Sequence, residues 1–145
     1  MKHLLSLTIF LLLTPTAYSK KDTGESLLNL QIKNIETDRG GQLIIFVFLE
    51  KGFPVEHDKA IRQKTIITKD TNIGITIEVP ASSGFAIKVL HDEDMNNILT
   101  KNWTGIIPAE GLGFSNGARL NFGPPEFSEA RINYSNKPHT IEMFY

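Results

Sequence analysis

The chain has 145 residues, a formal net charge of −1 and no cysteine. This length suits one ordinary domain, and without cysteine the fold must be stabilised by packing or by a bound ion rather than by disulfides. A charge so close to zero, with no long run of Lys or Arg, argues against nucleic acid and anionic membrane surfaces as partners.

Residues 1–19 have the layout of a secretory signal peptide. A short basic start precedes an apolar run at 4–13, and Ala17 and Ser19 place small side chains where a signal peptidase reads them. We therefore expect cleavage after Ser19, a periplasmic or secreted location, and a single β-sandwich domain over residues 20–145. The apolar run of about ten residues is too short to span a bilayer, so no stable membrane insertion is expected after cleavage.

Residues 20–145 predict an all-β fold, an antiparallel β-sandwich of about seven short strands separated by turn residues. The continuous apolar run 43–49 is typical of a central strand that is covered on both faces. In 73–79 and 84–90, apolar side chains alternate with other side chains, as in strands with one buried face. Residues 57–63 favour one or two helical turns. The expected strands, in chain order, are 27–35, 43–49, 64–68, 73–79, 84–90, 130–135 and 140–145.

Between residues 92 and 126 the chain has no convincing periodicity and is rich in Gly and Pro. A loop this long in a compact domain is usually functional or disordered. Its large apolar side chains favour one long ordered loop that packs over an end or a face of the sandwich. These side chains either extend the core or, where exposed, offer a stacking surface for a ligand. They are Trp103, Phe114 and Phe122, together with Phe127 directly after the segment.

An acidic loop directly follows the expected strand 84–90. A loop that curls around one point brings alternate side chains together, and an EF-hand-type calcium loop uses this spacing to present oxygen ligands. The expected ligands are the side chains of Asp92, Asp94, Asn96 and Thr100 and the carbonyl of Ile98. The alternative is a solvated loop whose polar side chains cap their own backbone.

The calcium pattern is incomplete. Position twelve, where a bidentate carboxylate is usual, holds Trp103, so Glu110 or Glu93 would have to supply the missing ligand. We therefore expect calcium binding to be weak, with a dissociation constant of about 0.1 to 1 mM, the range of extracellular modules.

Catalytic motifs are scarce in this chain. His91 would be a candidate general base with Glu110 or Glu126 as its partner, and Arg119 would hold an anion. The sequence contains no cysteine nucleophile, no Gly-x-Ser-x-Gly, no His-Glu-x-x-His and no phosphate-binding loop. We expect a protein that is not an enzyme, and a hydrolase centred on His91 is the alternative.

Several motifs are spread across nearly the whole mature chain. They are Gly52-Phe53-Pro54, residues 80–87, His91-Asp92-Glu93, residues 110–119 and residues 122–127. Together they resemble a family of bacterial exported proteins, the domain-of-unknown-function family 2141. The resemblance implies an immunoglobulin-like or transthyretin-like sandwich, and it brings no biochemical activity with it.

The acidic loop departs from the usual pattern of that family, His-Asp-Glu-Asn-Gly-Asn-Gly-Lys-Leu-Asp. Asp94 and Met95 stand at the first Asn and the first Gly, while Asn97 and Thr100 replace the second Gly and the last Asp. The lost Asp weakens the case for calcium, and the gained Asp94 partly offsets that loss.

The sequence thus predicts an exported, non-catalytic module that binds a protein or a glycan. The acidic loop would brace the Gly-rich segment, and the segment would form the contact surface. The expected binding residues are Trp103, Glu110, Phe114 and Arg119. The alternative is a purely structural envelope protein in which every aromatic side chain is buried.

Overall fold

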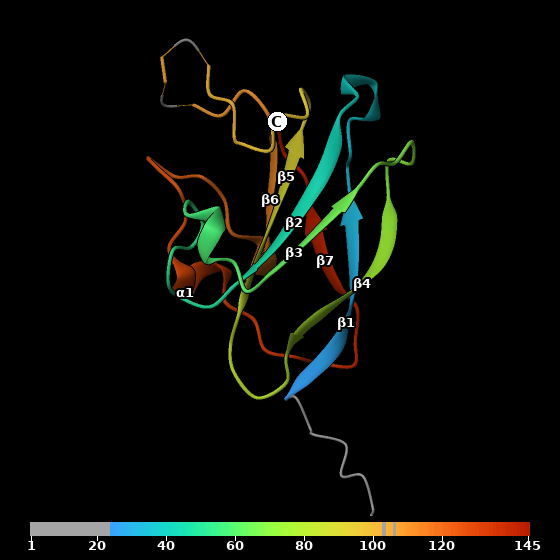
Figure 1. Ribbon diagram of the computed structural model, residues 1–145, viewed down its shortest axis with the longest axis vertical. Helices are drawn as coiled ribbons and strands as arrows, with labels where there is room; N and C mark the ends of the chain where they lie inside the picture. The colour runs from blue at the N-terminus through green and yellow to red at the C-terminus, as the bar shows by residue number, and fades with distance from the viewer. Residues whose placement is uncertain (1–23, 103, 106) are drawn as a thin grey trace, which may run out of the picture.

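The structure is a computed structural model that describes residues 24–102, 104–105 and 107–145. These residues form seven strands, three short 3-10 turns and one helical turn (Figure 1). The predicted all-β fold is therefore confirmed. The strands are β1 Glu25–Lys33, β2 Gln42–Phe48, β3 Arg62–Ile66, β4 Ile73–Pro80, β5 Ala86–Asp92, β6 Gly111–Phe114 and β7 His139–Glu142. The other elements are η1 Thr37–Arg39, η2 His57–Lys59, η3 Ser115–Gly117 and α1 Phe127–Ala130.

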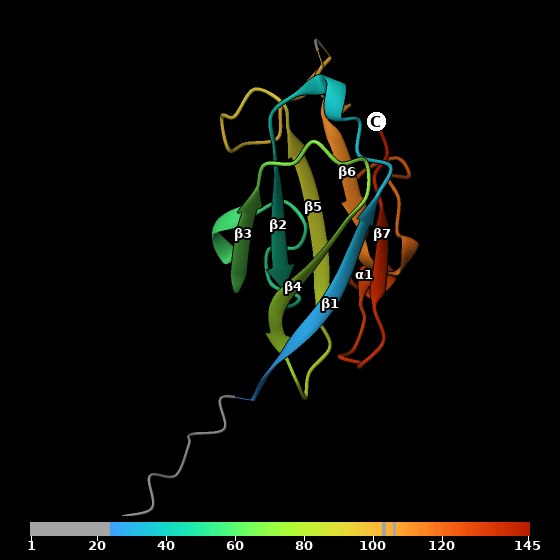
Figure 2. The same ribbon diagram turned by 90° about the vertical axis from the view of Figure 1, so that its right-hand side faces the viewer.

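The strands form two sheets that lie one over the other (Figure 2). One sheet has the order β4-β1-β7 and the other the order β3-β2-β5-β6. All strand pairs are antiparallel except β1 with β7, which run parallel. The two sheets are thus predominantly antiparallel, as predicted, and β1 with β7 is the one described pair that departs from this arrangement.

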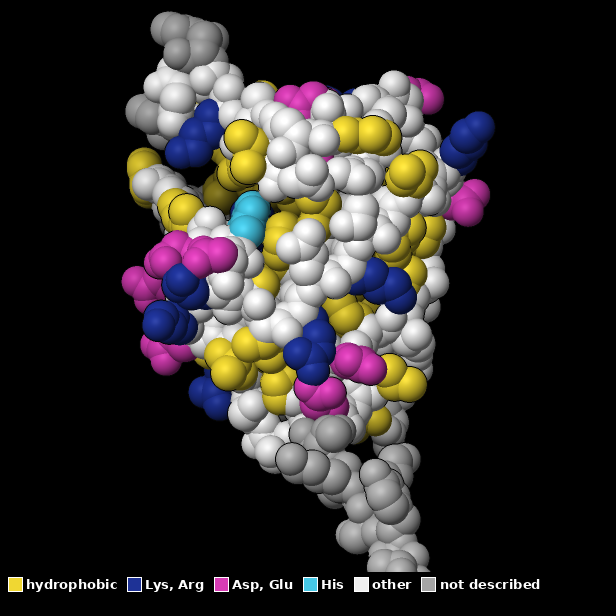
Figure 3. Space-filling model, in the orientation of Figure 1, with side chains coloured by type: hydrophobic (Ala, Val, Ile, Leu, Met, Phe, Trp, Pro, Cys, Tyr) yellow, Lys and Arg dark blue, Asp and Glu magenta, His cyan; other side chains and the backbone are white. Residues whose placement is uncertain are grey.

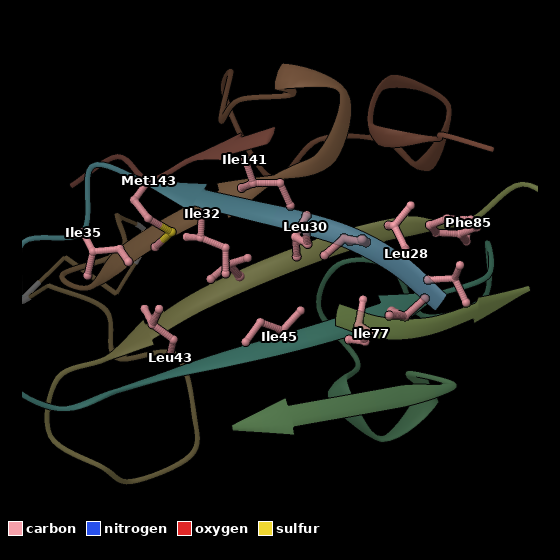
Figure 4. Close-up of a cluster of buried hydrophobic side chains, with 14 residues drawn as sticks. Leu28, Leu30, Ile32, Ile35, Leu43, Ile45, Ile77, Phe85, Ile141 and Met143 are labelled. Carbon is pink, nitrogen blue, oxygen red and sulfur yellow. The ribbon is translucent and has the colours of Figure 1, made fainter. Parts of the chain in front are cut away.

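The main core lies between the two sheets and follows from the alternation in the sequence. In β1, Leu28, Leu30 and Ile32 are buried while their neighbours along the strand are exposed. They point toward Leu43 and Ile45 of β2, as Figure 4 shows. Burying one such side chain fully contributes about 1.5–3 kcal/mol, so this layer supplies much of the driving force for folding.

A second core covers the outer face of the four-stranded sheet. Ile44, Phe46 and Phe48 of β2 point away from the first core and pack, with Leu90 of β5, against the connecting segments. These segments come mainly from residues 49–61 and 115–130 and lie along one side of the molecule (Figure 1, left). The prediction that 43–49 is covered on both faces is confirmed, with loops rather than a sheet as the second cover.

Strand β6 lies inside the segment predicted to be a long loop. Its sequence is Gly-Leu-Gly-Phe, so one face carries no side chain that could mark a strand. The glycines are needed there, because a Cβ at Gly113 would lie 2.7 Å from the Ile141 side chain of β7. Such a contact is too short for real carbon atoms, and only glycine allows β7 to pack this closely.

The strand predicted at 130–135 is not formed. α1 occupies the chain up to Ala130, and Ile132 makes only an isolated bridge with Phe85 through two backbone hydrogen bonds of 2.8 and 3.0 Å. The helical turns predicted at 57–63 reduce to the single 3-10 turn η2. Within the described residues, none of the helical segments is long and apolar enough to cross a membrane.

Candidate functional site

The acidic loop continues from the end of β5, and the structure brings three carboxylates together there. Asp92, Asp94 and Glu110 each offer an oxygen within 4.8 Å of the other two. Glu110 was one of the two residues expected to complete the ligand set. The other, Glu93, instead forms an ion pair of 3.1 Å with Arg39.

The carboxylates of the loop also cap its own backbone. The Asp92 oxygens accept hydrogen bonds from the backbone N–H groups of Asn96 (3.0 Å) and Asn97 (2.9 Å). Asp94 accepts a second bond from the Asn96 N–H (3.1 Å), and the Asn96 side chain in turn accepts the N–H of Ile98 (2.8 Å). Asn97 has a φ of 64°, a left-handed conformation that Asn tolerates well. This geometry matches the self-capped loop of the alternative reading, and calcium binding stays a prediction.

Glu110 fastens both ends of this loop to the segment that follows it. Its carboxylate accepts the backbone N–H groups of Glu93 (3.0 Å) and Thr100 (2.8 Å). Burial raises the pKa of Glu110, as do the charges of Asp94 and Asp92, while the two backbone hydrogen bonds lower it. The Thr100 hydroxyl lies 3.3 Å from Asp94, so the predicted ligand residues are neighbours in space.

His91 belongs to a separate hydrogen-bond network. The ring is buried, and its Nε2 lies 2.7 Å from the carbonyl of Gly40, to which it donates. Its Nδ1 then accepts the hydroxyl of Tyr145 (2.8 Å), and that oxygen accepts the N–H of Glu36 (2.9 Å). Both ring nitrogens are thus occupied within the fold, as expected for a structural histidine.

The partners suggested for a hydrolase lie elsewhere. Arg119 faces Glu142 at 3.7 Å and lies over the ring of Phe144, with 4.7 Å to the centroid. Glu126 and Glu129 form a capping box at the start of α1. Among the described residues, no hydrogen bond or ion pair joins either Arg119 or Glu126 to His91.

A pocket that the sequence did not predict opens on the outer face of the four-stranded sheet. Its volume is about 690 Å³, within the range of small-molecule sites. The walls come from the β2–β3 connection, from residues 98–101 and 107–108 of the β5–β6 connection and from residues 120–124, and the floor includes Leu112 and Phe114 of β6. Figure 3 shows a hollow on this side of the molecule, bordered by hydrophobic side chains and a histidine.

The pocket is surrounded by large hydrophobic side chains that face solvent. Their exposed fractions are 66% for Val55, 62% for Ile98, 58% for Ile107 and 110% for Phe122. These four residues come from three separate connections, and all of them line the same pocket. Contiguous exposed apolar surface of this kind marks interaction sites, whereas single exposed hydrophobic residues do not.

Lys88 of β5 lies in the floor of the pocket and is only 3% exposed. Its Nζ donates to the carbonyl of Pro54 (3.1 Å) and to Nε2 of His57 (2.8 Å). The His57 ring is stacked on Phe46 with centroids 4.1 Å apart. Burial lowers the pKa of Lys88 to about 8, and burial together with the Lys88 charge lowers the pKa of His57 to about 4.

The predicted binding residues within the described part of the chain lie in different parts of the structure and do not form one site. Phe114 is 2% exposed, so it contributes to the pocket floor and is no free stacking surface. Glu110 belongs to the acidic loop, and Arg119 lies on the surface beside β7. Trp103 lies outside the described residues.

The chain was compared with protein families, curated proteins and solved structures. No curated protein and no solved structure matches it significantly. The model of the family described as uncharacterized protein conserved in bacteria (DUF2141) matches residues 30–142. This match covers most of the chain and confirms the resemblance drawn from its motifs: the protein belongs to the DUF2141 family.

Proposed function

We propose that the protein is an exported, non-catalytic binding module whose ligand site is the apolar pocket on the outer face of the β3-β2-β5-β6 sheet. The observation that carries this proposal is the size of the pocket together with its ring of exposed hydrophobic side chains. Leaving such side chains in water is unfavourable, and a ligand that covers them recovers that free energy.

The sequence left a protein or a glycan open as the ligand, and the composition of the pocket favours an apolar ligand over a glycan. Among the described residues that line it, every side chain is apolar except those of His57, Lys88 and Lys101. A sugar needs a dense set of hydrogen-bond partners, because each hydroxyl that is buried without one costs free energy. An apolar ligand needs few such groups, and those few fix its orientation.

The acidic loop would support the site mechanically. Ile98, Leu99 and Lys101 form part of the pocket wall. Glu110 holds this stretch of chain through the N–H of the intervening Thr100. The same wall is braced by backbone hydrogen bonds from Ala109 to Thr100 (3.0 Å) and from Asn102 to Ile107 (2.8 Å). A calcium ion at the three carboxylates would strengthen this support, and its presence stays a prediction.

Export is proposed from residues 1–19, which lie outside the described residues. Cell fractionation and amino-terminal sequencing of the processed protein test it directly. The expected mature start is Lys20, and a protein that keeps its first residues and stays in the cytoplasm contradicts export without touching the binding proposal.

Titration with a neutral naphthylamine dye, followed by fluorescence, tests the binding function. We expect saturable binding that weakens about ten-fold in Val55→Ser and in Phe122→Asn, because each removes apolar contact area. Asn is chosen at 122 because Phe122 has a φ of 56°. Ile67→Ser is the matched control, since Ile67 is 71% exposed but does not line the pocket.

The absence of dye binding would overturn this proposal and favour the purely structural alternative. Equal weakening in the Ile67→Ser control would also count against it, because the dye would then bind hydrophobic surface without regard to the pocket.

A further inference from the structure

The floor of the pocket contains a buried cation in an unusual position. β5 is a central strand, and its register places Lys88 between Phe46 of β2 and Phe114 of β6. All three side chains point to the outer face, and Lys88 is 3% exposed. A lysine in such an apolar layer is costly unless its charge meets a partner.

Among the described residues, Lys88 has no carboxylate partner. Its ammonium group has three protons, and two of them are used by the Pro54 carbonyl and by Nε2 of His57. Both of these acceptors are neutral, because the lowered pKa of His57 keeps that ring uncharged near neutral pH. The described residues that line the pocket include no Asp or Glu, and the other charged residue among them is Lys101.

We propose that the ligand is an aliphatic carboxylate of medium chain length, whose carboxylate pairs with Lys88 while its chain lies against the apolar walls. The inference rests on the proposed binding function and adds the chemical class of the ligand. Two features of the pocket, its apolar surface and its uncompensated positive charge, complement the two parts of this ligand.

The arrangement also fixes the orientation of the ligand. Lys88 lies at the floor, whereas Val55, Ile98 and Phe122 stand exposed around the pocket. The head group therefore lies inward and the chain runs outward along the hydrophobic side chains. A ligand with a positively charged head is rejected, because it would meet Lys88 and Lys101 without a counter-charge.

The size of the preference follows from the strength of charge-assisted hydrogen bonds. Such a bond favours decanoate over decanol, which has the same chain and no charge, by about ten- to hundred-fold. Each additional buried CH₂ strengthens binding by about four-fold, so octanoate, which has two fewer CH₂ groups, is expected to bind about fifteen-fold more weakly than decanoate.

The test is a calorimetric titration of the protein with decanoate, decanol and decylamine. We expect decanoate to bind at least ten-fold more tightly than decanol, and decylamine to bind more weakly than either. Lys88→Met should remove the preference for decanoate while keeping the affinity for decanol. Ile67→Ser, remote from the pocket, should leave all three affinities unchanged.

A second measurement needs no variant. Raising the pH from 7 to about 10 deprotonates Lys88, whose pKa is about 8, and should weaken decanoate binding but not decanol binding. The other described titratable groups that line the pocket do not account for such a loss of affinity. His57 is neutral throughout this pH range, and Lys101 is exposed, so water screens its charge from the carboxylate.

The outcomes separate the two proposals. Equal affinity for decanoate and decanol, or a preference for decylamine, overturns the carboxylate assignment while the apolar site stands. Retention of the decanoate preference in Lys88→Met also overturns it. If none of these compounds nor the neutral dye binds, the binding function itself fails.

Discussion

The buried Lys88 makes a direct prediction about how the stability of the fold depends on pH. The perturbation is Lys88→Met, which keeps an unbranched side chain of similar length and removes the charge. In the folded protein the pKa of Lys88 is about 8, compared with 10.5 for the free side chain, because burial penalises the charged form. The folded state therefore binds this proton less tightly than the unfolded state does.

The sign and size follow from linkage. Below pH 8 both states carry the proton, and the folded state bears the full cost of the buried charge. Between pH 8 and 10.5 the folded state has released the proton while the unfolded state still holds it, so stability rises with pH. The difference between the two pKa values corresponds to about 3 kcal/mol, which the wild type gains across this range and Lys88→Met does not.

At neutral pH the same substitution has opposing effects. It relieves about 3 kcal/mol of charge burial, but it leaves the Pro54 carbonyl and Nε2 of His57 without their donor, at about 1–3 kcal/mol each. The net change at pH 7 is therefore small or destabilising. The diagnostic quantity is the change with pH of the difference in free energy of unfolding between the wild type and Lys88→Met. The two lost hydrogen bonds contribute about equally to this difference at every pH, so they do not affect its change.

Urea unfolding of both proteins at a series of pH values from 7 to about 10.5 measures this quantity. The free energy of unfolding of the wild type should rise relative to that of Lys88→Met by about 3 kcal/mol. The other titratable groups are present in both proteins, so their contributions cancel in the difference. Parallel curves for the two proteins would refute the reasoning, because they would mean that the ammonium group is solvated in the folded state.

Four further predictions follow from the same structure. As the pH falls from about 6.5 toward 4, thermal melting should show the wild type losing stability relative to His57→Gln, because the pKa of His57 is lowered to about 4; a constant difference would contradict this. Glu110→Gln should destabilise the protein by about 1–3 kcal/mol in urea unfolding, because the amide leaves an acceptor for only one of the two backbone N–H groups, of Glu93 and Thr100, that the carboxylate binds. Limited proteolysis should also cut the acidic loop faster, and unchanged cleavage would mean that Glu110 does not hold the loop in place. Calorimetry with calcium should give a dissociation constant of about 0.1 to 1 mM, and binding should be weaker in Asp94→Asn. The prediction is wrong if several millimolar calcium produces no heat and no shift of the melting temperature. Gly113→Ala should cost about 1–3 kcal/mol through overpacking against β7, whereas Gly74→Ala in β4, with open space around it, should stay within about 1 kcal/mol of the wild type; equal effects would show that β6 and β7 are not closely packed.

Strands with a clear alternation could be predicted because their signal is local. In β1 and β4 the apolar side chains recur at every second residue and face the main core, so the pattern itself identifies the buried face. Strand pairing is not local in this sense. The parallel pairing of β7 with β1 joins Leu30 to His139, and nothing near either residue in the sequence indicates that contact.

The acidic loop shows how far spacing alone can predict a site. The alternation of Asp92 and Asp94 predicted that their side chains would converge, and they do. The third carboxylate, Glu110, comes from beyond the loop, and only the antiparallel pairing of β5 with β6 brings it near. Which of Glu93 and Glu110 would join them was decided by this pairing and by the ion pair between Glu93 and Arg39.

The position of Lys88 could have been inferred by combining two local patterns. Lys88 alternates with Ile87 and Val89, and taken alone this indicates an outward, solvated lysine at the surface of a half-buried strand. The run 43–49, however, indicates a strand covered on both faces. If the two strands are neighbours, the outer side chains of both lie under the same cover, and the lysine is buried. Their pairing, which sets Phe46 opposite Lys88, is the long-range fact that neither pattern contains. Local rules predict that this charged side chain is exposed to solvent, but the fold buries it. A functional site is expected where such a conflict occurs.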